Sequence, residues 1–163
     1  MGIVSFKKIM IATDGSACSE LAADKGIAFA RLSGGTVYAV HVLSKAYLSA
    51  MDGSAYPSFG MNPDWESIKE AFQKHGQQAL NYVKDLGKIK GVNVESIMLE
   101  GNPADELIRY AEENKMDIVT MGTLGKSGID RFLLGSVTEN ILRHSKVPVM
   151  VVKEKYKPWA ECK

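Results

Sequence analysis

The strongest constraint on the fold is an alternation of short apolar runs, each of strand length, with longer segments of helical periodicity. The apolar runs occupy residues 8–13, 36–42, 92–99, 118–121 and 147–152. Between them, apolar residues recur at helical spacing over about 19–33, 63–86, 103–111 and 136–142. Strands that alternate with helices through short loops form parallel sheets with right-handed crossovers. The sequence therefore predicts an α/β fold with an open five-stranded parallel sheet and helices on both faces.

Start and stop signals agree with this division. Asn62-Pro63 and Asn102-Pro103 each place a capping residue before a proline at the first helical position, and Gly34-Gly35 ends the first helix. Residues 44–62 show neither strand nor helix periodicity, so we expect a long loop there. The chain of 163 residues has the length of one domain, which we expect to span 1–163 with a short C-terminal tail at 154–163.

Charge and composition argue against several partners. The chain has 20 Lys and Arg against 19 Asp and Glu, which gives no electrostatic case for binding nucleic acid or an anionic membrane. No apolar stretch approaches membrane-spanning length. The two cysteines, Cys18 and Cys162, lie near opposite ends and match neither a metal site nor a disulfide framework. We expect a protein of the reducing cytoplasm.

Two turns are candidates for a ligand site, because ligands of such sheets bind beyond the carboxyl ends of the strands. Thr13-Asp14-Gly15-Ser16 follows the first strand, and a glycine-bearing loop from Gly122 to Gly135 follows the fourth and opens a helix. Glycines and a helix N-terminus present main-chain amides to a polyanion. Each charge-assisted hydrogen bond is worth about 1.5–3 kcal/mol against about 0–1 kcal/mol for an exposed ion pair, so we expect amides to dominate phosphate binding.

Two familiar phosphate-binding motifs are excluded. Gly125-Lys126-Ser127 is similar to the end of a P-loop, but that motif needs a glycine at position 120, where this chain has Thr120. The dinucleotide fingerprint is missing after the first strand, where Asp14-Gly15-Ser16 stands instead. NAD is therefore disfavoured.

Taken together, Gly122, Gly125 and Gly135-Ser136 resemble the nucleotide-binding signature G-x2-G-x9-G-[S/T] of the universal stress protein family. The segments 7–16, 41–42, 101–103, 134–138 and 147–152 also look like family segments, in the same order along the chain. The resemblance covers nearly the whole chain except about 44–62 and the tail.

The resemblance implies a Rossmann-like sheet of the adenine nucleotide alpha hydrolase type with strand order 3-2-1-4-5. It implies an adenine nucleotide (ATP, ADP or AMP) with a Mg or Mn ion on the phosphates, whose protein ligands stay unknown. By position, the residues around adenine and ribose would be Ala12, Thr13, Asp14 and Val42. Those following ribose and phosphates would be Met121, Gly122, Thr123, Gly125, Lys126, Ser127, Gly135, Ser136, Val137 and Thr138. A homodimer through antiparallel pairing of the fifth strand would use Val149, Met150, Val151 and Val152.

Structural roles compete with these functional ones. Asp14 can cap the first helix, and Gly135-Ser136 can cap the last one without any ligand, whereas Gly122 and Gly125 have no evident structural role. We expect His41 to be a hydrogen-bonded residue at the rim of the pocket. His75 and His144 are expected on helix surfaces.

The function predicted is a nucleotide-binding regulatory or stress-adaptation protein whose nucleotide state changes a surface for a protein partner. No carboxylate pair or nucleophile–base arrangement is evident in the sequence, so no catalytic residue is assigned. Two alternatives stay open. One is a slow ATP hydrolase or nucleotidyl enzyme that uses Asp14 and a divalent metal, and the other is a dimeric scaffold with a vestigial pocket.

Overall fold

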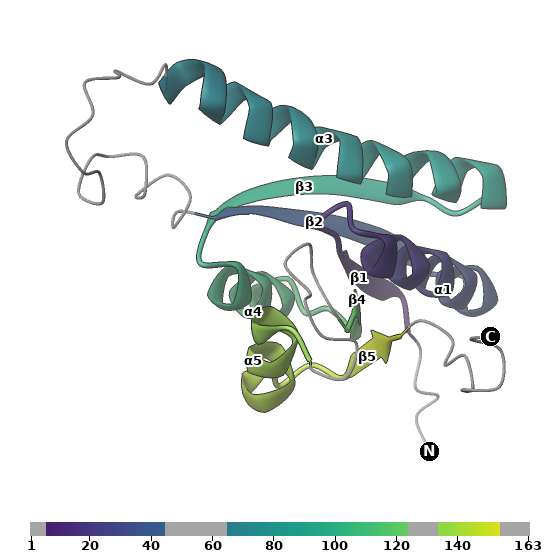
Figure 1. Cartoon of the computed structure of the whole chain (residues 1–163). Coiled ribbons are helices and arrows are strands. Elements are labelled where there is room, and N and C mark those ends of the chain that lie inside the picture. Colours follow the sequence, from purple (N-terminus) through teal and green to yellow (C-terminus); the bar gives the residue numbers. More distant parts are fainter. Residues whose placement is uncertain (1–5, 45–64, 124–133, 154–163) are drawn as a thin grey trace, which may run out of the picture.

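The computed structural model describes residues 6–44, 65–123 and 134–153 (Figure 1). The elements in chain order are β1 (Lys8–Ala12), α1 (Ala17–Ser33), β2 (Thr36–Ser44), α3 (Trp65–Lys90), β3 (Val94–Gly101), α4 (Pro103–Glu113), β4 (Ile118–Gly122), α5 (Ser136–His144) and β5 (Val149–Val152). All strand pairs are parallel, and the order across the sheet is β3-β2-β1-β4-β5. The predicted fold class and strand order are confirmed.

Several boundaries differ from the sequence prediction, among them that of β3, which runs over Val94–Gly101 and not over 92–99. Helix α1 begins at Ala17, about two residues earlier than expected, because Ser16 caps it and accepts a hydrogen bond from the Ser19 amide. Strand β5 begins at Val149 and not at Val147. The predicted loop at 44–62 starts inside β2 and otherwise lies outside the described residues, as do the helix start at Asn62-Pro63 and the tail at 154–163.

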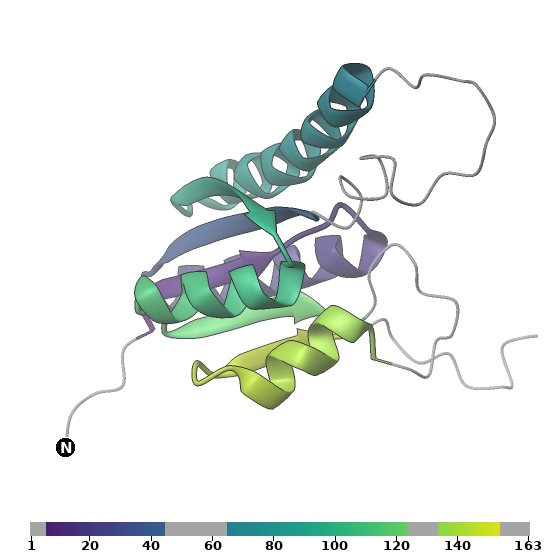
Figure 2. The same ribbon diagram turned by 90° about the vertical axis from the view of Figure 1, so that its left-hand side faces the viewer.

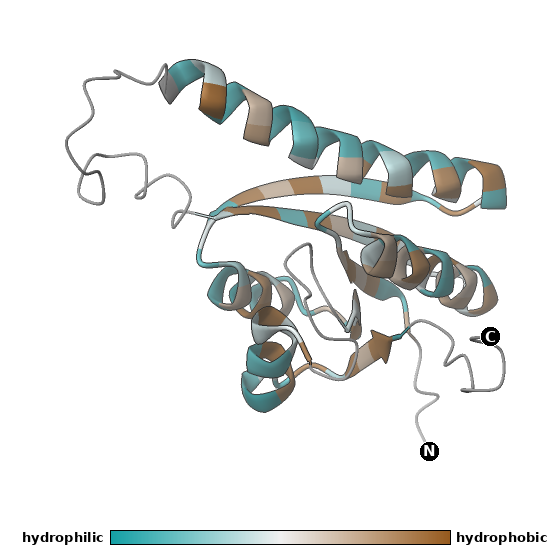
Figure 3. Ribbon diagram, in the orientation of Figure 1, coloured by the Kyte–Doolittle hydropathy of each residue, from teal (hydrophilic) through white to brown (hydrophobic). Residues whose placement is uncertain are grey.

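The sheet is covered on both faces, as Figures 1 and 2 show from two sides. Helices α1 and α3 pack on one face, where Ile9, Ile11 and Leu80 belong to one buried cluster. Helices α4 and α5 pack on the other face around Met10 and Val119. Figure 3 shows hydrophilic residues along the outer side of α3, as expected for a helix with one buried face. No helix within the described ranges is long and apolar enough to cross a membrane.

One buried hydroxyl is unusual. Thr120 of β4 is 0% exposed, and its Oγ1 has no hydrogen-bond partner in the described part of the chain. A buried hydroxyl without a partner costs free energy of folding.

The two outer strands of the sheet differ in character. Strand β3 exposes Glu95, Ser96 and Glu100 among its eight residues. Strand β5 consists of three valines and one methionine, and all four are half-buried. Within the described part of the chain, one outer strand of the sheet is therefore polar and the other is apolar.

Candidate functional site

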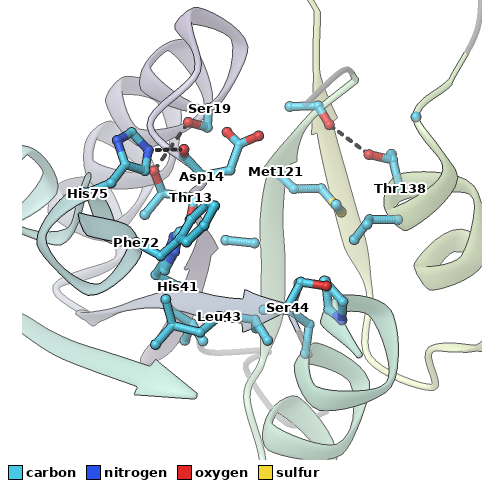
Figure 4. Close-up of a pocket in the computed structure, with 18 of the residues that line it drawn as sticks. Thr13, Asp14, Ser19, His41, Leu43, Ser44, Phe72, His75, Met121 and Thr138 are labelled. Atoms are coloured by element: carbon cyan, nitrogen blue, oxygen red, sulfur yellow. Dashed lines mark hydrogen bonds between the residues drawn. The ribbon is translucent and has the colours of Figure 1, made fainter. Parts of the chain in front are cut away.

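A cavity of about 310 Å³ lies at the carboxyl ends of the strands (Figure 4). Its wall combines the ends of β1, β2 and β4 with the first turn of α5 and with residues of α3 and α4. The volume is at the lower end of the range for small-molecule pockets, about 300–1,000 Å³. Its location is the one that the parallel topology predicts for a ligand.

Ten of the fourteen predicted site residues line this cavity. They are Ala12, Thr13, Asp14, Val42, Met121, Gly122, Gly135, Ser136, Val137 and Thr138. Thr123 does not line it, and Gly125, Lys126 and Ser127 lie outside the described residues. The structure therefore brings together residues from opposite ends of the chain, which the sequence analysis had associated only through the family resemblance.

The turn after β1 is organised by its own side chains. The Ser16 amide donates to Asp14 Oδ1 at 3.0 Å, and Gly15 adopts a φ of 75°, which suits glycine. Thr13 Oγ1 lies 3.2 Å from Ser19 Oγ, which fixes the turn to the first turn of α1. Asp14 thus makes a local turn interaction and also lines the cavity, so its structural and functional roles are compatible.

The N-terminus of α5 is built differently from those of α1 and α4. Ser16 caps α1 through its side chain, and the side chain of Asn102 accepts from two amides at the start of α4. At α5 the capping position is Gly135, which makes no side-chain cap hydrogen bond. The first amides of α5 therefore receive no side-chain acceptor from their own cap, and they adjoin the cavity. Such a helix start is suited to an anion.

Two threonines near this helix have structural bonds. Thr138 is 3% exposed, and its Oγ1 donates to the main-chain oxygen of Gly122 at 3.0 Å. The Thr123 amide donates to Val152 O at 3.0 Å, and Thr123 O accepts from the Gly135 amide at 2.8 Å. Thr123 thus joins β5 and the start of α5 behind the cavity wall, and the hydroxyl of Thr138 is already engaged.

Gly122 has a packing role that the sequence did not reveal. A Cβ built on Gly122 would lie 2.8–2.9 Å from the carbonyl carbon, Cβ and carbonyl oxygen of Cys18 in α1. Real Cβ contacts are almost never this short, so only glycine lets β4 end against α1. The expectation that Gly122 has no structural role is wrong, because this contact joins residues more than a hundred positions apart.

Helix α3 supplies a wall of the cavity that sequence reasoning missed. Lys69, Phe72 and His75 of α3 line the cavity. The other lining residues beyond the predicted set are Ser19, Val40, His41, Leu43, Ser44, Glu100, Pro103 and Leu107. The expectation that His75 lies on a helix surface is wrong, since it is half-buried and its Nε2 donates to Asp14 O at 3.0 Å. His144, by contrast, is exposed as expected.

His41 behaves as the sequence predicts. It is 8% exposed, lines the cavity and donates from Nδ1 to Thr13 O at 2.8 Å.

The sequence holds one signal for the wall formed by α3, which is the pair His75-Gly76. A glycine inside a helix weakens the helix and usually marks a close approach of another part of the chain.

The described lining carries little positive charge. Its ionisable carboxylates are Asp14 and Glu100, and its cation is Lys69. In the described ranges no three His, Cys, Asp or Glu side chains are grouped so that they could hold a metal ion. A bound polyanion would therefore depend on main-chain amides more than on these side chains.

Sequence comparison places the chain among known proteins. The model of the Universal stress protein family matches residues 5–153. Universal stress protein MJ0531 of Methanocaldococcus jannaschii is 40% identical over 149 residues, which cover 91% of this chain and 83% of that protein. Universal stress protein MJ0577 of the same organism is 34% identical over 158 residues, which cover 93% and 98%.

Solved structures agree with the sequence matches. The structure of MJ0577 is similar with a TM-score of 0.77 and 30% identity, over 93% of this chain and 99% of that one. A universal stress protein solved in complex with cAMP is similar with a TM-score of 0.64 and 25% identity, over 91% and 98%. The family match, the relatives and the shared fold lead to one conclusion: this chain belongs to the universal stress protein family.

Proposed function

We propose that this chain binds an adenine nucleotide, with ATP as the first candidate, in the cavity at the carboxyl ends of the strands. The observation that carries the proposal is the start of α5, where Gly135 leaves the first amides without a side-chain cap beside the cavity. Phosphate groups are the natural partners of such amides. Ala12 and Val42, also in the wall, offer an apolar surface for a base.

The remaining site residues would have different roles in this proposal. Asp14 would face the ribose, and Ser136, Val137 and Thr138 would donate main-chain amides to the phosphates. Gly125, Lys126 and Ser127 stay predictions, since they lie outside the described residues. Thr123 would act behind the wall, through the bonds that it makes to Val152 and Gly135.

A divalent ion fits the charges of the site. A triphosphate would meet two carboxylates and one lysine among the described lining residues, which leaves its negative charge largely unbalanced. A Mg or Mn ion held mainly by the phosphates would supply the missing charge, because Mg typically keeps several waters and few protein ligands. We assign no protein ligand to this ion, because the described residues contain no group of three His, Cys, Asp or Glu side chains that could hold it.

Relatives support the nucleotide class. One universal stress protein of similar fold has been solved with cAMP, an adenine nucleotide. The family match over 5–153 also supports one domain for the whole chain, with 154–163 as a tail. A regulatory role in stress adaptation, a cytoplasmic location and a homodimer through β5 complete the proposal. The site is built from α3, β1, β2, β4 and α5, so a ligand that bridges them would change the surface that these elements present to a partner.

The first test identifies the ligand. Purified protein is denatured, its small molecules are analysed by mass spectrometry, and ATP binding is measured by calorimetry and thermal shift with Mg present. We expect an adenine nucleotide or a clear rise in melting temperature at millimolar ATP. Absence of both would contradict the proposal. Phosphate release measured in the same samples tests the hydrolase alternative.

A variant then locates the site. Gly135 has an ordinary φ of −62°, so Gly135→Val introduces a side chain at the α5 start without backbone strain. We expect it to reduce ATP affinity by roughly tenfold or more, equivalent to about 1.4 kcal/mol. Ala28→Val on the exposed side of α1 is the matched control and should bind as the original does. Unchanged binding by Gly135→Val would mean that the nucleotide sits elsewhere.

A further inference from the structure

Two successive main-chain carbonyls at the end of β1 are held by histidines from two different elements. His41 Nδ1 of β2 lies 2.8 Å from Thr13 O, and His75 Nε2 of α3 lies 3.0 Å from Asp14 O (Figure 4). A carbonyl oxygen can only accept, so each imidazole is the donor. In this arrangement Nδ1 of His41 and Nε2 of His75 each carry a hydrogen.

Two glycines let the histidines approach so closely. A Cβ on Gly15 would lie 3.0 Å from His75 Nε2, and a Cβ on Gly76 would lie 2.5 Å from Cδ2 of His41. The two adjacent residues of α3 thus each contact the sheet end: His75 packs on Gly15, and Gly76 packs on His41. The two imidazole rings meet edge to face, with centroids 6.3 Å apart. Helix α3 is therefore interlocked with the turn after β1.

This turn carries the carboxylate that faces the cavity. Asp14 Oδ1 accepts from the Ser16 amide at 3.0 Å, and Asp14 O accepts from His75. One residue is thus fixed at both its side chain and its main chain. The Asp14–Gly15 peptide is also held on its other side, where the Gly15 amide donates to Thr13 Oγ1 at 3.3 Å. Loss of the His75 donor would remove one of these bonds and so loosen the main chain that carries the Asp14 carboxylate.

We propose that His75 is a positioning residue of the nucleotide site, which holds Asp14 in its binding orientation and so makes nucleotide affinity depend on how α3 docks. The proposal rests on the proposed nucleotide function and adds its regulation. A shift of the N-terminal half of α3 would change the affinity through the hydrogen bond from His75 to Asp14 O. In the reverse direction, a bound nucleotide that fixes Asp14 stabilises the docked position of α3, because coupling between two sites is reciprocal.

The test compares two substitutions of nearly equal shape. His75→Gln keeps an amide donor at the position of Nε2, whereas His75→Met fills the same space without a donor. We expect His75→Met to weaken Mg-ATP binding roughly threefold to tenfold, the equivalent of one net hydrogen bond, and His75→Gln to restore most of the loss. His144→Met, on the exposed end of α5, is the control and should bind as the original does.

A double-mutant cycle separates positioning from general stability. If His75 acts through Asp14, the penalty of His75→Met should shrink to less than about twofold in an Asp14→Ala background, whereas a merely structural effect would add in full. Amide exchange of Ser16 in the ligand-free protein gives a second measurement, and it should be faster in His75→Met than in His75→Gln. Should His75→Met not fold, His75→Asn replaces it, because its shorter amide does not reach the carbonyl.

The outcomes are distinct. If the original chain does not bind Mg-ATP, the proposed function fails and this inference fails with it. If the original binds, the inference alone is overturned by equal binding of the Gln and Met variants, by an undiminished penalty in the Asp14→Ala background, or by equal Ser16 exchange. Loss, rescue and non-additivity together support it.

Discussion

Thr138 of α5 donates its hydroxyl hydrogen to the main-chain oxygen of Gly122 at the end of β4, over 3.0 Å. The bond joins residues 16 positions apart and is buried. It places the open start of α5 against the strand end that forms the floor of the cavity. The position of the α5 amides that we propose bind phosphate therefore depends on the Thr138 hydroxyl, which is itself engaged and not available to a phosphate.

Thr138→Val removes this bond while preserving the shape of the side chain. The buried carbonyl of Gly122 would lose a donor, so we expect the free energy of unfolding to fall by about 1–3 kcal/mol. ATP affinity should also fall, because the start of α5 is no longer fixed. Urea denaturation and calorimetry measure the two effects. Thr138→Ser keeps the hydroxyl and should retain most of the affinity; an equal loss in both variants would contradict the bond's role.

Gly135→Asp should raise stability and lower affinity at once. An aspartate at this position would cap the first amides of α5, which we expect to stabilise the ligand-free protein by up to about 1 kcal/mol. The same carboxylate would occupy the amides and repel a phosphate, so ATP affinity should fall by roughly tenfold or more, about 1.4 kcal/mol. Thermal melts with and without ATP report both effects.

Gly135→Ala is the control for that substitution, since it adds a methyl group but no acceptor. It should not stabilise the ligand-free protein. If Gly135→Asp leaves both the melting temperature and the ATP affinity unchanged, the amides at the start of α5 are not available in the way that we propose.

Thr120→Val should stabilise the protein. The change replaces a hydroxyl that is buried and without a partner among the described residues by a methyl group of similar size. We expect a gain of about 1 kcal/mol in the free energy of unfolding, because the desolvation cost of the hydroxyl disappears. Chemical denaturation of Thr120→Val and Thr138→Val in the same experiment provides a control. The same substitution should raise the free energy of unfolding at Thr120 and lower it at Thr138. A loss in Thr120→Val would show that its hydroxyl has a partner.

Met150→Lys should separate the proposed homodimer. The four residues of β5 are half-buried in an outer strand of the described sheet. A lysine there would place a positive charge on the outer strand of each copy, and like charges at a strand edge oppose pairing. We expect a dimer for the original chain and a monomer for the variant, by light scattering on a sizing column. Leu142→Lys removes an exposed apolar residue of α5 outside this strand and should stay dimeric.

The architecture was largely accessible from sequence because it depends on local patterns. The apolar runs and the helix cap at Asn102 depend on neighbouring residues, and the structure confirms the strands. At α5 the capping residue is Gly135 and not Ser136. The strand order, which the structure also confirms, came from the family resemblance. The boundary errors have local causes too. Helix α1 starts earlier than its first apolar residues suggest, since its start is set by the cap at Ser16 and not by hydrophobicity.

The site was only partly accessible. The turn residues Thr13 and Asp14 follow from the topology rule for parallel sheets, and the resemblance to a known family supplied the glycine pattern. The α3 wall could not be predicted, because Phe72 and His75 reach the cavity only through the way in which α3 docks on the sheet. Helical periodicity shows which residues share a face, but it does not show which end of the helix meets the strand ends. The packing of Gly122 on Cys18 depends on tertiary structure in the same way.

The contrast between the outer strands limits how copies of this chain can assemble. Strand β3 displays two glutamates, which discourage another strand from adding there, whereas β5 offers an uncharged edge. Two copies joined through β5 about a two-fold axis would each have used the uncharged outer strand of the described sheet. Growth of an extended sheet, and with it the route to fibrous aggregates, would end at the pair.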